Sequence, residues 1–79
     1  MQAKRIKEMF LLFQKTVKLY EERKYIDCVL NCETITYTLD DIYLGSIQNI
    51  GLQNRYRQIR RKLLQEIDSL YEICCLKLQ

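Results

Sequence analysis

The chain has 79 residues and a formal net charge of +3 at pH 7, with 48% apolar and 29% charged residues. This length and composition are those of one small globular domain rather than of a disordered chain. The sequence contains no histidine, no proline and two glycines, so no histidine can activate a nucleophile and no glycine-rich loop can hold phosphate groups. We therefore expect no enzymatic activity and no cofactor, and a protein that acts through its surface.

The sequence predicts no transmembrane segment. Its longest uninterrupted apolar run is Met9–Phe13, which is far too short to cross a bilayer. Basic residues precede this run as they do in a signal peptide, but no small-residue cleavage site follows it. We therefore expect an intracellular protein, located in the cytoplasm.

The four cysteines are expected to be reduced and mostly buried, as is usual inside the cell. Cys28 and Cys32 lie one helical turn apart, whereas Cys74 and Cys75 are adjacent. Adjacent side chains on a helix point about 100° apart, so both rarely reach one ion. We therefore expect no metal site.

Between residues 3 and 23, apolar residues recur at spacings of three and four, which predicts an amphipathic helix. The residues of this stripe are Ile6, Met9, Phe10, Phe13, Val17 and Tyr20. Three leucines beside the stripe widen it, as expected for a helix that contacts two neighbours. The basic residues of this element would also suit attachment to a membrane surface, but a domain this small needs the aromatic residues in its core.

Residues 25–43 carry a second stripe with helical spacing. It consists of Tyr25, Cys28, Cys32, Ile35, Leu39 and Ile42. Within it, Thr34–Leu39 alternates polar and apolar side chains, which is also typical of a half-buried strand. Because no second strand-like run is available as a partner, we expect a helix. Gly45 is predicted to end it in the left-handed conformation that glycine adopts readily.

After a loop at residues 46–53, we expect a third helix at residues 54–78 with Asn54 as its N-cap. Its apolar face is wide, which indicates contact with both other helices or a surplus for a partner. The face consists of Ile59, Leu63, Ile67, Leu70 and Cys74, with Leu64, Tyr71, Cys75 and Leu78 beside them. We therefore predict a single all-α domain over residues 1–79, folded as an antiparallel three-helix bundle.

Charge is unevenly distributed along the chain. Most charged side chains of residues 1–24 are basic, and all charged side chains of residues 25–54 are acidic. A basic cluster follows. This cluster consists of Arg55, Arg57, Arg60, Arg61 and Lys62. Arginines interleaved with a tyrosine suit the binding of nucleic acid through phosphate contacts and base stacking. The simpler interpretation is an exposed face that pairs with the acidic second helix.

The run Leu19–Val29 resembles the turn of a tetratricopeptide-type helical hairpin, in which a tyrosine begins the second helix and a small residue follows three positions later. Tyr25 and Cys28 occupy these positions. One hairpin followed by a long third helix is similar to the microtubule-interacting and trafficking (MIT) domain, a three-helix bundle of about this length. The third-helix pattern of that family, Tyr-Leu-x-Arg-Ala-Glu-x-Leu, corresponds to Leu63–Leu70, with Glu66 in place of the arginine and Ile67 in place of the alanine.

The resemblance implies a non-enzymatic adaptor, peripheral to the endosomal membrane, that binds short C-terminal motifs of ESCRT filament subunits. An amphipathic peptide helix would lie in the groove between the second and third helices. Leu64 would contact peptide leucines, and Asp68 would pair with a peptide arginine or lysine. The residues that we expect at this site are Leu63, Leu64, Ile67, Asp68, Tyr71, Asp27 and Glu33. The alternatives are nucleic-acid binding by the basic cluster and a structural homo-oligomer formed through the third helix.

Overall fold

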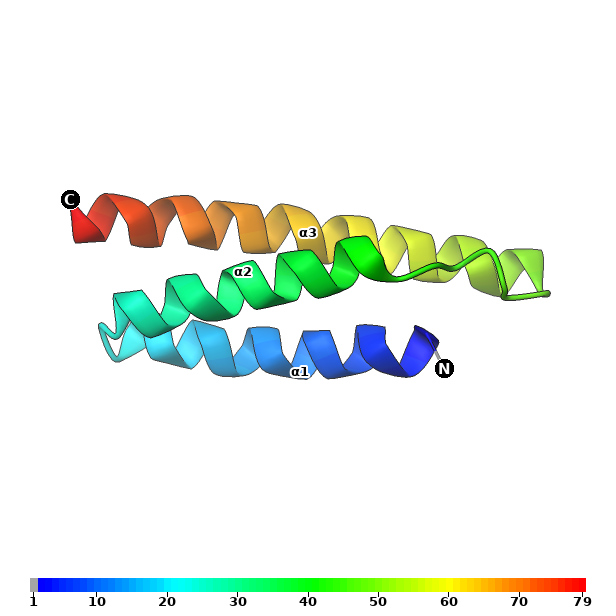
Figure 1. Ribbon diagram of the computed structural model, residues 1–79, viewed down its shortest axis with the longest axis horizontal. Coiled ribbons are helices and arrows are strands. Elements are labelled where there is room, and N and C mark those ends of the chain that lie inside the picture. The colour runs from blue at the N-terminus through cyan, green and yellow to red at the C-terminus, as the bar shows by residue number, and fades with distance from the viewer. Residues whose placement is uncertain (1) are drawn as a thin grey trace.

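The computed structural model describes residues 2–79 and contains three helices, α1 (Gln2–Glu21), α2 (Tyr25–Asp41) and α3 (Ile50–Leu78). Helices α1 and α3 run in the same direction, and α2 runs antiparallel to both (Figure 1). The prediction of an all-α three-helix bundle is confirmed. Residues Thr34–Leu39 are helical, so the alternative of a strand at this position is wrong.

The core lies along α2, which packs on both other helices, while α1 and α3 contact each other over a shorter length. The core consists of the buried residues Ile6, Cys28, Cys32, Ile35, Leu39, Ile42, Leu44, Leu63, Ile67 and Cys74. Thr16 is also fully buried, and its hydroxyl donates a 2.7 Å hydrogen bond to the carbonyl of Leu12 within α1. The apolar spacing identified most of the residues that pack together, but Phe10 and Ile59 of the predicted stripes are exposed, and the buried Thr16 was not predicted.

The turn between α1 and α2 is closed by backbone hydrogen bonds that are typical of a Schellman motif. The amide of Lys24 donates to the carbonyl of Leu19 at 2.9 Å, and the amide of Arg23 donates to that of Tyr20 at 3.0 Å. Arg23 adopts a left-handed φ of 63°. An arginine thus occupies the position that usually favours glycine.

Helix α2 ends at Asp41, earlier than the predicted end at residue 43, and Gly45 does not have a positive φ. The chain leaves the helix because Ile42 and Leu44 both turn into the core, with 3% and 2% of their surfaces exposed. Side chains two residues apart share a side only in extended backbone. A Cβ at Gly45 would meet the outer end of the exposed Tyr43 ring.

Helix α3 begins at Ile50 rather than at the predicted residue 54, and its N-cap is Asn49 rather than Asn54. The Asn49 side-chain oxygen accepts a 2.9 Å hydrogen bond from the amide of Leu52. The Gln53 side chain then fixes the preceding loop by donating to the carbonyls of Leu44 and Ile47 at 3.1 and 3.2 Å.

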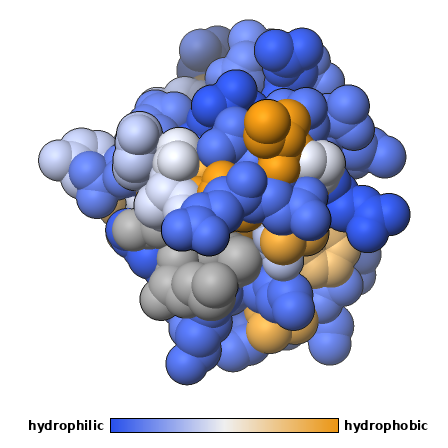
Figure 2. Space-filling view, turned by 90° about the vertical axis from the view of Figure 1, so that its right-hand side faces the viewer, coloured by the Kyte–Doolittle hydropathy of each residue, from blue (hydrophilic) through white to orange (hydrophobic). Residues whose placement is uncertain are grey.

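The molecule is elongated, with extents of 45 × 17 × 16 Å, because α3 has 29 residues and α2 only 17. The first turns of α3 therefore extend past the end of α2 and lie beside residues 42–49 (Figure 1). Seen from this end, the surface is mostly hydrophilic with separate apolar patches (Figure 2).

Candidate functional site

Two adjoining hollows lie between α2 and α3, and we call them together the α2–α3 groove. The larger has a volume of about 530 Å³ and is lined by Thr36, Arg57, Arg60, Arg61, Leu64, Gln65 and Asp68. The smaller has a volume of about 290 Å³ and is lined by Glu33, Thr36, Tyr37, Asp40, Asp68 and Tyr71. Because Thr36 and Asp68 line both, the two hollows form one continuous feature.

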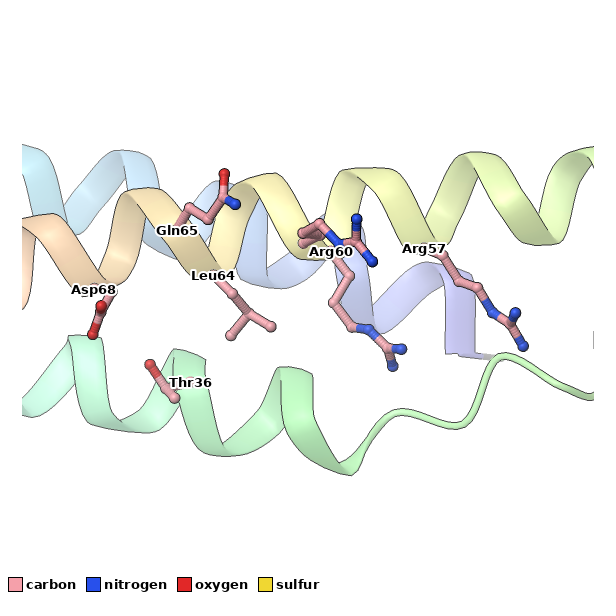
Figure 3. Close-up of a pocket in the computed structure, with 7 residues that line it drawn as sticks. Thr36, Arg57, Arg60, Leu64, Gln65 and Asp68 are labelled. Atoms are coloured by element: carbon pink, nitrogen blue, oxygen red, sulfur yellow. The ribbon is translucent and has the colours of Figure 1, made fainter.

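Helix packing decides which side chains face the α2–α3 groove. Leu64 of α3 and Thr36 of α2 point toward each other across it, whereas Gln65 points away (Figure 3). Leu64 is half-buried, so it forms an apolar floor that still has surface for a partner. On the α2 side, Tyr37 is 80% exposed and stands at the rim. The groove thus has an apolar middle with an exposed aromatic residue beside it.

The α2–α3 groove carries charges of both signs. Arg57, Arg60 and Arg61 line the larger hollow. Glu33 and Asp40 line the smaller hollow, and Asp68 lines both. Within residues 2–79, none of these six side chains forms an ion pair with another member of the groove. A ligand that carries both signs of charge would therefore meet complementary groups along the groove.

Four of the seven predicted partner-binding residues come together in the α2–α3 groove: Glu33, Leu64, Asp68 and Tyr71. Leu63 and Ile67 do not, because they are core residues with 3% and 1% exposure. Asp27 lies elsewhere, in a hollow beside the α1–α2 turn.

The sequence interpretation missed Thr36 and Tyr37 as groove residues. The signal was present, because Tyr37 follows Glu33 by four positions and precedes Asp40 by three, which places all three on one side of a helix. The sequence interpretation also did not place Arg57, Arg60 and Arg61 in the same groove as the acidic residues.

The basic cluster does not form a single surface. Arg57, Arg60 and Arg61 line the groove, but Lys62 lies in a different hollow of about 460 Å³ between α1 and α3. Arg60 also donates a 2.7 Å hydrogen bond through Nη1 to the carbonyl of Ile42. In the described part of the chain, no cation of this cluster forms the predicted ion pair with the second helix. The ion pair that involves the second helix joins Arg5 of α1 to Asp41 of α2, at 3.6 Å.

All four cysteines are free, and Cys28, Cys32 and Cys74 are buried while Cys75 is partly exposed. Burial raises the pKa of Cys32 to about 11 and that of Cys74 to about 12, because a thiolate is poorly solvated in the core. Burial likewise raises the pKa of Cys28, although a hydrogen bond from Cys74 opposes this. Among residues 2–79, no group of three or more cysteine, aspartate or glutamate side chains is arranged to hold a metal ion.

No protein-family model matches the chain, and neither a curated protein nor a solved structure matches it. None of the three helices, over the range that the structure describes, is long and apolar enough to span a bilayer. Inferences about function therefore depend on the geometry and charge of the α2–α3 groove and on the sequence patterns described above.

Proposed function

We propose that this protein is a non-enzymatic interaction module whose α2–α3 groove binds a short peptide segment of a protein partner. The observation that carries the proposal is the combination of the half-buried Leu64 with basic and acidic side chains that line the same groove. A helix laid into a groove is a common mode of peptide recognition, with apolar anchors at helical spacing.

The dimensions of the groove agree with a peptide helix of modest length. Arg57 and Tyr71 mark its two ends on α3, and the fourteen helical steps between them correspond to about 21 Å. A partner helix of about four turns would cover this distance. Its apolar side chains would contact Leu64 and the Tyr37 ring, and both residues retain surface for this contact.

The resemblance of the sequence to MIT domains supports a more specific partner. In that family the corresponding groove binds amphipathic C-terminal motifs of ESCRT filament subunits, and we propose the same class of partner here. Asp68 would pair with a basic residue of the motif. This partner would locate the protein in the cytoplasm, at the surface of endosomal membranes.

Titration of the protein with fluorescently labelled peptides from the C-terminal tails of ESCRT filament subunits tests this proposal. Leu64→Asp would place a charge on the apolar floor, and Asp68→Lys would reverse a charge of the groove. We expect each variant to weaken binding at least about fivefold, because removal of one anchor or charged partner costs on the order of 1–3 kcal/mol.

Asp27→Lys is the matched control, since it reverses one acidic charge of α2 outside the groove. It should bind nearly as the unmodified protein does. Equal affinity of all three variants and the unmodified protein would refute the groove as the binding site.

Nucleic acid is a second candidate ligand, because Arg57, Arg60 and Arg61 converge on one hollow. Retention on an immobilised nucleic-acid column that falls steeply with salt, and that Arg57→Ala and Arg61→Ala reduce, would favour it. Light scattering distinguishes both candidates from a structural homo-oligomer, since a monomer excludes the latter.

A further inference from the structure

The core contains a pair of thiols that approach each other across the α2–α3 interface. Cys74 Sγ of α3 lies 3.1 Å from Cys28 Sγ of α2, and the two residues are 46 positions apart in the chain. Both side chains are fully buried. We infer that this pair is a modification site at which a peroxide oxidant forms a disulfide that joins α2 to α3.

Geometry favours this pair over the other cysteines. A disulfide needs an S–S distance of about 2.05 Å, so the Cys28 and Cys74 sulfurs must approach by about 1 Å, which is a small adjustment for two facing side chains. Cys28 and Cys32 lie on one helix, where Cβ atoms four positions apart are about 5–6 Å from each other. That distance exceeds the ~3.5–4.5 Å that a disulfide requires.

The direction of the hydrogen bond assigns a role to each sulfur. Cys74 Sγ donates and Cys28 Sγ accepts. The donated hydrogen bond stabilises the thiolate of Cys28 relative to that of Cys74, so Cys28 is the sulfur that ionises more readily and attacks first. In the first step, the Cys28 sulfur attacks one peroxide oxygen and the O–O bond breaks. This gives a sulfenic acid on Cys28, and the thiol proton leaves with the other oxygen as water.

In the second step, the Cys74 sulfur attacks the sulfenic sulfur of Cys28. The S–O bond breaks, the S–S bond forms, and the Cys74 proton leaves with the hydroxyl group as a second water. The sum is two thiols and one hydrogen peroxide giving one disulfide and two waters, with both sulfurs oxidised and both oxygens reduced. Burial favours the neutral thiol of each residue, so we expect a slow reaction that accelerates as pH rises.

The test uses the double variant Cys32→Ala with Cys75→Ser, which retains only Cys28 and Cys74. After treatment with hydrogen peroxide, we expect its intact mass to fall by the mass of two hydrogen atoms and to recover with dithiothreitol. The oxidised form should also unfold at a Tm about 10 °C or more above the reduced form, because the bond closes a long loop. A gain of oxygen atoms with no loss of hydrogen, or two thiols still open to alkylation after unfolding, would overturn the inference.

The unmodified protein provides a second measurement that does not depend on how the double variant folds. Tryptic digestion of the oxidised chain without reduction should give the peptide 25–55, which contains Cys28 and Cys32, linked to the peptide 63–77, which contains Cys74 and Cys75. Cys28→Ser and Cys74→Ser should each lose this linked peptide, whereas Cys32→Ser and Cys75→Ser should retain it. Retention in Cys28→Ser and loss in Cys32→Ser would identify a different pair and contradict the assignment.

Discussion

Arg60 of α3 holds the C-terminal end of α2 through a single contact to Ile42. The Arg60 Nη1 atom donates a 2.7 Å hydrogen bond to the Ile42 carbonyl, and Ile42 is the C-cap of α2. The last carbonyl groups of a helix have no partner within it, and they form the negative end of its dipole. A residue of the basic cluster is therefore part of the connection between α2 and α3, in addition to lining the groove.

Arg60→Ala should lower the free energy of unfolding by about 1–2 kcal/mol, because it removes a charged donor from a part-buried carbonyl and a cation from a helix C-terminus. Urea unfolding followed by circular dichroism measures this change. Arg61→Ala is the matched control, since it removes an exposed arginine of the same helix and should change stability by less than about 0.5 kcal/mol. Equal losses in the two variants would contradict the capping role of Arg60.

Arg23→Gly should stabilise the protein by about 0.5–1 kcal/mol. Arg23 has a left-handed φ of 63°, where a side chain with a Cβ costs on the order of 1 kcal/mol and glycine does not. The greater freedom of glycine in the unfolded chain offsets part of this gain. Arg23→Ala keeps the Cβ and should leave stability nearly unchanged in the same urea experiment. A glycine variant less stable than the alanine variant would refute the prediction.

Asn49→Ala should cost about 1 kcal/mol of stability, because it removes the side-chain acceptor of the α3 N-cap. Asn54 lies inside the first turns of α3 and is exposed, so Asn54→Ala should be neutral or slightly stabilising, since alanine is the better helix former. Thermal unfolding of the two variants side by side distinguishes a cap at Asn49 from one at Asn54. The reverse order of stabilities would indicate that the N-cap of α3 is Asn54 and not Asn49.

The stability of the reduced protein should decrease between about pH 9 and pH 11. Unfolded thiols ionise near their ordinary pKa of 9.0, whereas burial raises the pKa of Cys32 to about 11 and that of Cys74 to about 12. In this window the unfolded chain loses protons that the folded chain retains, so the free energy of unfolding falls as pH rises, by up to about 1.4 kcal/mol per pH unit for each thiol.

Urea unfolding with a reducing agent at about pH 8 and at about pH 10 measures this slope. Cys75→Ser is the control, because Cys75 is partly exposed and is not one of the buried thiols. Cys74→Ala should make the slope shallower. An identical slope in the unmodified protein and in the Cys74 variant would contradict the proposed cause.

The helices could be predicted because burial follows a spacing that the sequence shows directly. Their ends were harder to predict where two local signals competed. After Asp41, the glycine at position 45 indicated a left-handed helix end, but the alternation of buried Ile42, exposed Tyr43 and buried Leu44 is the pattern of extended backbone. Tertiary burial determined the end of α2.

The groove could be predicted only in part, because an apolar stripe does not show which of its residues are buried in the core and which remain partly exposed. Leu63 and Leu64 are neighbours on the predicted face, yet a rotation of about 100° between them places the first in the core and the second in the groove. Asp27 shares its charge and helix with Glu33, but it points elsewhere. Position around a helix, rather than residue type, determines which of the predicted residues line the groove.

The unequal lengths of α2 and α3 determine how the molecule would come apart. The first turns of α3 are held by the short segment from Ile42 to Asn49, through the Gln53 hydrogen bonds and the burial of Leu44. Segments with so few buried contacts open at lower free energy than the rest of a domain. Heating should therefore unfold this end before the opposite one, where Cys28, Cys32 and Cys74 pack together. Unfolding of the bundle would then begin at the first turns of α3 and proceed toward its C-terminal end.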